Sequence, residues 1–70
     1  MPRYTIDFDD DFDKTLLELV KDTSAPTKAE VIRRAVASYS YLKKQQRNDA
    51  NVKVSITDKN DKVIKEIVLP

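Results

Sequence analysis

Near the N-terminus the chain reads Arg3-Tyr4-Thr5-Ile6-Asp7-Phe8, in which polar and apolar side chains alternate strictly. This period of two is typical of a β-strand with one buried face and one exposed face. A strand this short is not stable alone, and the next pattern in the chain is helical rather than a second strand. We therefore expect it to pair with the same strand of a second copy, which would place Tyr4, Ile6 and Phe8 in the core of a homodimer.

A helical pattern begins directly after this strand. Three aspartates at positions 9–11 offer capping carboxylates and negative charge for the positive end of a helix dipole. Apolar side chains then recur at helical spacing from Phe12 to Val20. These features predict a first helix from about Asp10 to Asp22.

A turn and a second helix come next. Pro26 lacks an amide proton and biases Ala25 away from the helical region, so the first helix must end before it. Thr27 and Glu30 have the spacing of a capping box, which opens a second helix that we expect to end at about Gln46. The apolar stripe of this helix supplies further residues that we assign to the dimer core: Ile32, Ala35, Val36 and Tyr39.

The C-terminal part of the chain has the pattern of a β-hairpin. Residues 47–51 form a polar linker, and polar and apolar side chains then alternate from Val52 to Thr57. Residues 58–61 are typical of a turn, and the return segment 62–69 is apolar enough to pair with the first strand. That segment contains two apolar doublets, Val63-Ile64 and Ile67-Val68. We therefore expect its register to be ambiguous or bulged.

Composition narrows the class of protein. A chain of 70 residues folds as one domain and buries only about 60% of the surface of its unfolded form. With no cysteine and no histidine, disulfides and the common zinc sites are excluded, and dimerisation remains as reinforcement. The lack of these residues and of any glycine-rich phosphate loop predicts a protein that is not an enzyme and uses no cofactor. No apolar run could span a membrane, so we expect a cytoplasmic protein.

Charge is distributed unevenly along the chain. The net charge is +1, but acidic residues crowd into positions 7–13, whereas basic residues are frequent between positions 28 and 47. One face could therefore be basic and another acidic. Asp7, Asp9, Asp11 and Glu18 match ligand positions of an EF-hand calcium loop, but Phe12 stands where that loop requires glycine. We therefore expect no metal site.

The order of strand, helix, turn and helix resembles the ribbon-helix-helix (Arc/MetJ/CopG-type) repressors. The resemblance covers roughly Arg3 to Lys44, and its best matches are RYTIDF at 3–8 and TKAEVIRRAVASY at 27–39. It implies an α+β homodimer with an intersubunit antiparallel β-ribbon and two helices per subunit. Residues 1–46 would be the DNA-binding and dimerisation domain, 47–51 a linker, and 52–70 a C-terminal β-hairpin that packs or interacts.

In that family the ribbon enters the major groove of double-stranded DNA, and its outward side chains contact base edges. The resemblance carries this role to Arg3, Thr5 and Asp7. An arginine can donate two hydrogen bonds to guanine, and a threonine can offer a hydroxyl or a methyl group. Asp7 can accept from cytosine, but phosphates repel its carboxylate, so it either contacts a base or stays outside the groove.

The start of the second helix carries the other family feature, a grip on a phosphate by backbone amides and the helix dipole. Thr27, Lys28 and Ala29 occupy that position, where the lysine adds charge without sequence information. Many relatives have a glycine in the turn before this helix. Here residues 24–26 read Ser-Ala-Pro.

The resemblance predicts a sequence-specific transcriptional regulator, a repressor that binds an inverted repeat as a dimer or as two adjacent dimers. One alternative is the antitoxin of a toxin–antitoxin pair, in which the tail binds a small protein partner. Such tails are often unfolded until bound, whereas residues 52–69 have the pattern of a folded hairpin. A second alternative is a dimerisation scaffold without DNA binding, which the acidic start and the low net charge would suit.

Overall fold

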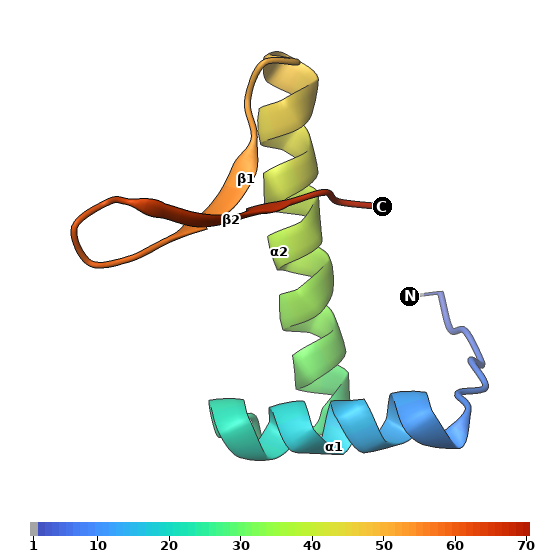
Figure 1. The fold of residues 1–70 in the computed structure, drawn as a ribbon. Coiled ribbons are helices and arrows are strands. Elements are labelled where there is room, and N and C mark those ends of the chain that lie inside the picture. Colours follow the sequence, from blue (N-terminus) through green and yellow to red (C-terminus); the bar gives the residue numbers. More distant parts are fainter. Residues whose placement is uncertain (1) are drawn as a thin grey trace. The chain divides into compact units, whose positions relative to one another are not determined.

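The computed structural model describes residues 2–70 and contains two helices and a two-stranded antiparallel sheet (Figure 1). The elements in chain order are α1 (Asp10–Thr23), α2 (Lys28–Asn48), β1 (Val54–Thr57) and β2 (Val63–Ile67), and the strand predicted over residues 3–8 is not among them. The chain is therefore of the α+β class. It divides into two units, Met1–Ala35 and Val36–Pro70, whose border lies within α2.

Helix α1 begins and ends with local hydrogen bonds. The Asp9 carboxylate accepts a hydrogen bond from the Phe12 amide at 2.7 Å, which satisfies one of the amides left open at a helix start. At the other end the Val20 carbonyl accepts from the amides of Ser24 and Ala25. The helix thus runs one residue beyond the predicted end.

The turn between the helices contains a serine in a conformation that usually belongs to glycine. Ser24 has φ 54° and ψ 31°, in the left-handed region, where a side chain costs about 1 kcal/mol or more. A residue other than glycine thus takes the left-handed conformation that ends α1.

The core of the N-terminal unit is small. Among the described residues, Leu16 of α1, Ala25 of the turn and Val31 of α2 are the buried apolar side chains, and Val20 and Ile32 pack against them. Pro26 comes directly after the buried alanine and leads into the second helix. The turn thus contributes to the core as well as joining the two helices.

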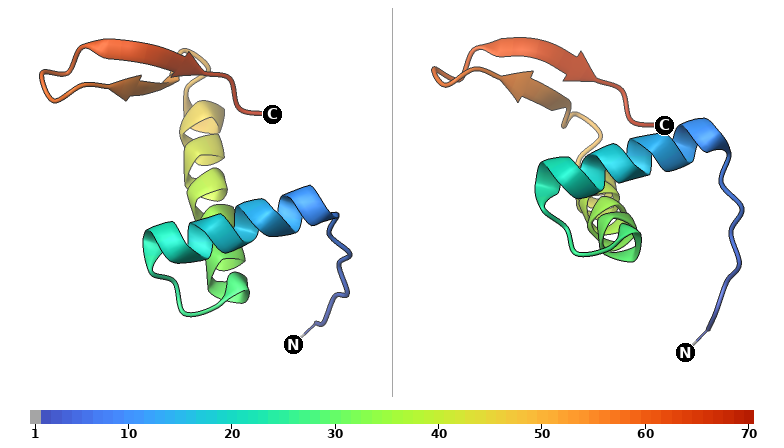
Figure 2. Two further views of the ribbon diagram at one scale, coloured as in Figure 1. Left: turned by 60° about the horizontal axis from the view of Figure 1, so that its bottom comes forward. Right: turned by 90° about the horizontal axis from the view of Figure 1, so that it is seen from below.

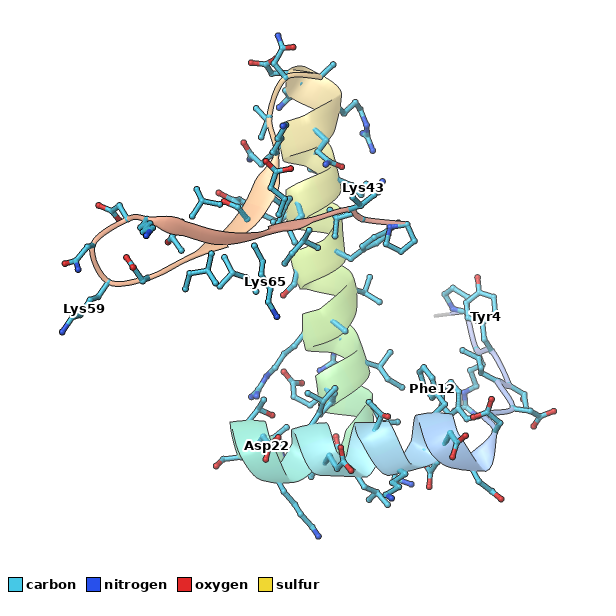
Figure 3. All side chains as sticks on the ribbon, viewed as in Figure 1. Tyr4, Phe12, Asp22, Lys43, Lys59 and Lys65 are labelled. Atoms are coloured by element: carbon cyan, nitrogen blue, oxygen red, sulfur yellow. The ribbon has the colours of Figure 1, made fainter. Side chains whose placement is uncertain are left out.

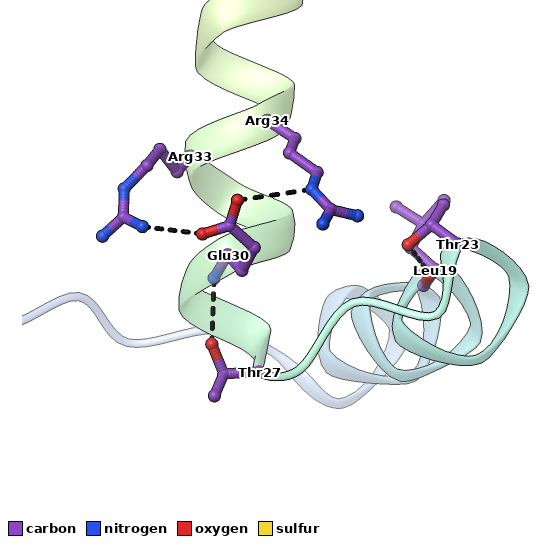
Figure 4. A network of polar contacts seen from close by, with 6 residues as sticks. All are labelled: Leu19, Thr23, Thr27, Glu30, Arg33 and Arg34. Carbon is purple, nitrogen blue, oxygen red and sulfur yellow. Dashed lines mark hydrogen bonds and ion pairs between the residues drawn. The ribbon is translucent and has the colours of Figure 1, made fainter.

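Helix α2 starts with half of the predicted capping box (Figure 4). The Glu30 amide donates to the Thr27 hydroxyl at 3.1 Å. The Glu30 carboxylate does not return this contact, because it pairs with Arg33 at 2.6 Å and with Arg34 at 3.3 Å. The helix ends at Asn48, so the first two residues of the predicted linker are helical.

The C-terminal hairpin is present, with shorter strands than predicted. Its register pairs Val54 with Ile67 and Ile56 with Lys65, and it shifts between Ile56 and Thr57. Thr57 faces Val63, so Ile64 is the extra residue of a bulge. The predicted irregularity at the first apolar doublet is therefore confirmed.

Asp58 organises the turn of this hairpin. Its carboxylate accepts from the amides of Asn60 at 2.8 Å and Lys62 at 3.1 Å. Its own amide donates to the Lys62 carbonyl, and Asp61 takes a left-handed conformation with φ 65°. Aspartate favours such turns because its side chain bonds to the backbone just ahead of it. The prediction of a turn at residues 58–61 is confirmed.

The segment before α1 has no regular secondary structure in the single chain (Figure 2). Tyr4 is 82% exposed and Ile6 63% exposed, whereas Phe8 stacks on Phe12 with ring centroids 4.5 Å apart. A strand needs hydrogen bonds from a neighbour, and the neighbour expected here is a second copy. The strand over 3–8 therefore stays a prediction.

Candidate nucleic-acid interface

The three residues predicted to contact bases lie together on the segment before α1. Arg3, Thr5 and Asp7 are exposed, and their side chains make no hydrogen bond or ion pair with any other described residue. If the segment is extended, residues two apart share a face, so the three side chains would line one side. Their polar groups are thus available to an external partner.

The predicted phosphate contacts at the start of α2 are exposed but partly engaged. The Thr27 hydroxyl accepts from Glu30 and still has a proton to donate. The Lys28 ammonium pairs with the Asp13 carboxylate of α1 at 2.7 Å, with both side chains less than half exposed. The first amides of a helix have no partner within it, so the amides of Lys28 and Ala29 are the donors best suited to an anion.

Two arginines in the N-terminal part of α2 are also engaged. Both Arg33 and Arg34 pair with Glu30, whose side chain is 26% exposed. Sequence reasoning did not single out this network, although a glutamate three and four residues before two arginines is a known helical pairing pattern. The sequence contains no comparable spacing pattern for the pair between Lys28 and Asp13, because the two residues are 15 positions apart and meet only through the shape of the turn.

The residues predicted for the dimer core are mostly exposed in the single chain. Ile32 is partly buried against the N-terminal core, whereas Val36 is 62% exposed and Ala35 is also exposed. Tyr4 projects from the N-terminal segment (Figure 3). This apolar surface is what a dimer would cover, and its burial between subunits stays a prediction.

The C-terminal unit keeps most of its apolar side chains exposed. The Tyr39 hydroxyl donates to the Pro70 carbonyl, and the Lys43 ammonium lies 5.8 Å from the centre of the Tyr39 ring. Leu42, Val54 and Leu69 are partly buried. The hairpin also carries five exposed large apolar side chains: Ile56, Val63, Ile64, Ile67 and Val68. The hairpin therefore presents apolar surface beyond its own contacts.

The acidic run has a structural role in α1. Asp9 caps the helix, and Asp10, Asp11 and Asp13 lie in its first turn, where negative charge stabilises the helix dipole. An EF-hand loop is not formed, because α1 occupies most of the run. Within residues 2–70 no group of three acidic side chains could hold a metal ion.

Over residues 2–70, neither helix combines the length and the apolar character needed to cross a bilayer. Comparison with known proteins gives no match, because no family model fits the chain and no curated protein or solved structure is significantly similar to it.

Proposed function

We propose that the chain is a DNA-binding transcriptional regulator of the ribbon-helix-helix type, a repressor that acts as a homodimer. Two copies of segment 3–8 would form an antiparallel ribbon in the major groove. Arg3 and Thr5 would contact base edges, and the start of α2 would hold a phosphate.

The observation that carries the proposal is the placement of an exposed, alternating segment directly before a two-helix unit. Arg3, Thr5 and Asp7 have free polar groups, and Tyr4 and Ile6 expose apolar surface on alternate positions. A polar face for DNA and an apolar face for a dimer are the two properties that a β-ribbon needs.

The start of α2 supports the same function. Thr27 caps the helix without using its proton, and Lys28 is held beside it by Asp13. Backbone amides at a helix start bind phosphate without a side-chain charge. Such a contact would orient the ribbon on the duplex but would not select a sequence.

Selection of bound sites from a random duplex library tests the proposal at near-physiological salt. The wild type should enrich a palindromic motif, whereas an Arg3→Ala, Thr5→Ala variant should keep only weak, unselective and salt-sensitive binding. The matched control is Lys59→Ala, Ser40→Ala, which also removes one cation and one hydroxyl from exposed positions and should enrich the wild-type motif. Absence of any enriched motif with the wild type contradicts DNA recognition.

The exposed hairpin supports a second candidate, a protein-binding role such as that of an antitoxin tail. Ile64 is 58% exposed and Val68 is 92% exposed, and a two-stranded sheet leaves both outer edges unpaired. An Ile64→Lys, Val68→Lys variant should then lose binding to a small protein partner and keep its DNA motif. If the variant loses the DNA motif instead, the hairpin serves DNA binding.

A further inference from the structure

The register of the proposed ribbon can be derived from symmetry. Residues directly opposite each other in an antiparallel pair point to the same face. The two-fold axis of the dimer is perpendicular to the ribbon, so one residue faces the same residue of the second copy. The two residue numbers of every opposed pair then add up to an even number. In segment 3–8, each possible register is named by the residue on the axis.

Two registers are unfavourable. With Asp7 on the axis, two carboxylates would face each other, and like charges directly opposite are destabilising. With Tyr4 on the axis, Pro2 would face Ile6, and the ladder would end at once because proline has no amide to donate. Two further registers are also unfavourable. With Arg3 on the axis, two guanidinium groups would face each other. With Phe8 on the axis, Asp7 would face Asp9 and Ile6 would face Asp10, which lies in α1. Thr5 and Ile6 are therefore the residues that remain.

The Asp9 cap of α1 distinguishes the Thr5 register from the Ile6 register. With Ile6 on the axis, Arg3 would face Asp9 of the second copy, whose carboxylate already accepts from the Phe12 amide at 2.7 Å. With Thr5 on the axis, Arg3 faces Asp7, which has no partner among the described residues. This register leaves both helix caps intact.

The Thr5 register also matches the side chains on both faces. On the polar face it forms two Arg3–Asp7 pairs, one on each side of a central Thr5–Thr5 pair. On the apolar face Tyr4 of each copy packs on Ile6 of the other. Opposite charges and apolar pairs at directly opposed positions are each stabilising.

We infer that Asp7 binds Arg3 of a second copy of the chain and sets the ribbon register at Thr5, rather than reading a base. This inference rests on the proposed homodimeric ribbon. Arginine has five donors, so Arg3 can pair with Asp7 and still reach a guanine. Asp7 would then act as a positioning residue for Arg3, and the pair would offset the repulsion between Asp7 and phosphates.

Cysteine cross-linking measures the register directly, since the chain has no cysteine of its own. With Thr5 on the axis, the two Thr5 Cα atoms lie about 4.5–5.5 Å apart, within disulfide range. The two Ile6 Cα atoms then lie about 7–8 Å apart, beyond that range. Under mild oxidation Thr5→Cys should form a disulfide dimer at least tenfold faster than Ile6→Cys. A faster reaction of Ile6→Cys overturns the inference.

Charge exchange tests the pair itself. Arg3→Asp and Asp7→Arg should each weaken dimerisation roughly tenfold, because both pairs become repulsive. The double variant Arg3→Asp, Asp7→Arg should recover dimerisation, since the two charges have only changed places. Lys59→Asp makes the same change in net charge as Arg3→Asp, but in the hairpin turn, and should leave the dimer unchanged. A double variant as weak as the single variants overturns the inference.

The DNA motif separates failure of this inference from failure of the proposed function. Asp7→Asn should weaken binding to all sites alike, because it weakens the pair with Arg3, and should keep the wild-type base preferences, because residue 7 reads no base in this register. Loss of preference at one base pair, with the dimer intact, would mean that Asp7 reads a base, so the inference fails and the function stands. A wild type that neither dimerises nor selects a motif overturns both.

Discussion

The two ends of the chain contain alternating stretches with the same period but different outcomes. Residues 54–57 form β1 and pair with β2, whereas residues 3–8 form no strand in the single chain. The difference lies in the residue that comes next in each case. Asp58 reverses the chain within a few residues and brings a second strand alongside, but Asp9 starts a helix. An alternating pattern thus indicates a strand only where a partner can reach it.

The largest effect is expected from a substitution that disrupts the proposed pairing of segment 3–8 between two copies of the chain. Ile6→Lys places a charge on the apolar face of the ribbon, which costs about 3 kcal/mol or more, roughly a hundredfold in dimer affinity. Analytical ultracentrifugation should show a monomer that no longer selects a DNA motif. Ile56→Lys, the matched change in β1, should stay dimeric. A dimeric Ile6→Lys protein would contradict the ribbon.

The helices between the two stretches depend on a core of their own. Leu16 is 4% exposed and Leu17 is 43% exposed, so Leu16→Ala leaves a cavity that Leu17→Ala does not. Leu16→Ala should lower the free energy of unfolding by about 3 kcal/mol, measured by urea titration, and Leu17→Ala should lower it by less than about 1 kcal/mol. Equal losses would show that α1 packs differently.

A smaller effect is expected at the turn that gives β1 its partner. Asp58→Ala removes two side-chain hydrogen bonds to turn amides and should destabilise the hairpin by about 1–2 kcal/mol. Since a two-stranded sheet is marginal by itself, cross-strand NMR contacts between Val54 and Ile67 should weaken. Lys59→Ala, in the same turn, should leave them unchanged. If Asp58→Ala also leaves them unchanged, the turn is not what holds the strands together.

The smallest expected effect is a gain in stability. Ser24→Gly relieves the left-handed conformation at the end of α1 and should raise the free energy of unfolding by about 0.5–1 kcal/mol. Ser40→Gly, within α2, should lower it by a similar amount. Thermal unfolding followed by circular dichroism measures both. A loss in both variants would place Ser24 in an unstrained conformation.

Much of the local structure was predictable because its causes are local. The Thr27 cap, the Asp58 turn and the bulge at Ile64 each depend on residues a few positions apart. Helix ends were less well predicted: α2 continues to Asn48, because the polar residues after Gln46 lack a breaker. The strands are shorter than their patterns because an unpaired strand end forms no ladder.

The candidate site was predictable only in part. Arg3, Thr5 and Asp7 are exposed, but so are the apolar residues between them, so the predicted alternation of a buried and an exposed face stays a prediction. The engagement of Lys28 by Asp13 could not be predicted, since it depends on how the turn places α1 against the start of α2. Only one contact of the predicted capping box forms. The Glu30 amide donates to Thr27, but the Glu30 carboxylate pairs with two arginines instead of the Thr27 amide.

The internal ion pairs would affect how the proposed DNA binding responds to salt. Each phosphate neutralised by a protein cation releases a bound counterion and steepens the fall of affinity with salt. Lys28, Arg33 and Arg34 already have carboxylate partners within the chain, so each that keeps its partner adds little to this release. A regulator built in this way would owe more of its affinity to neutral amide and hydroxyl donors. It would hold its operator over a wider range of ionic strength than its number of cations suggests.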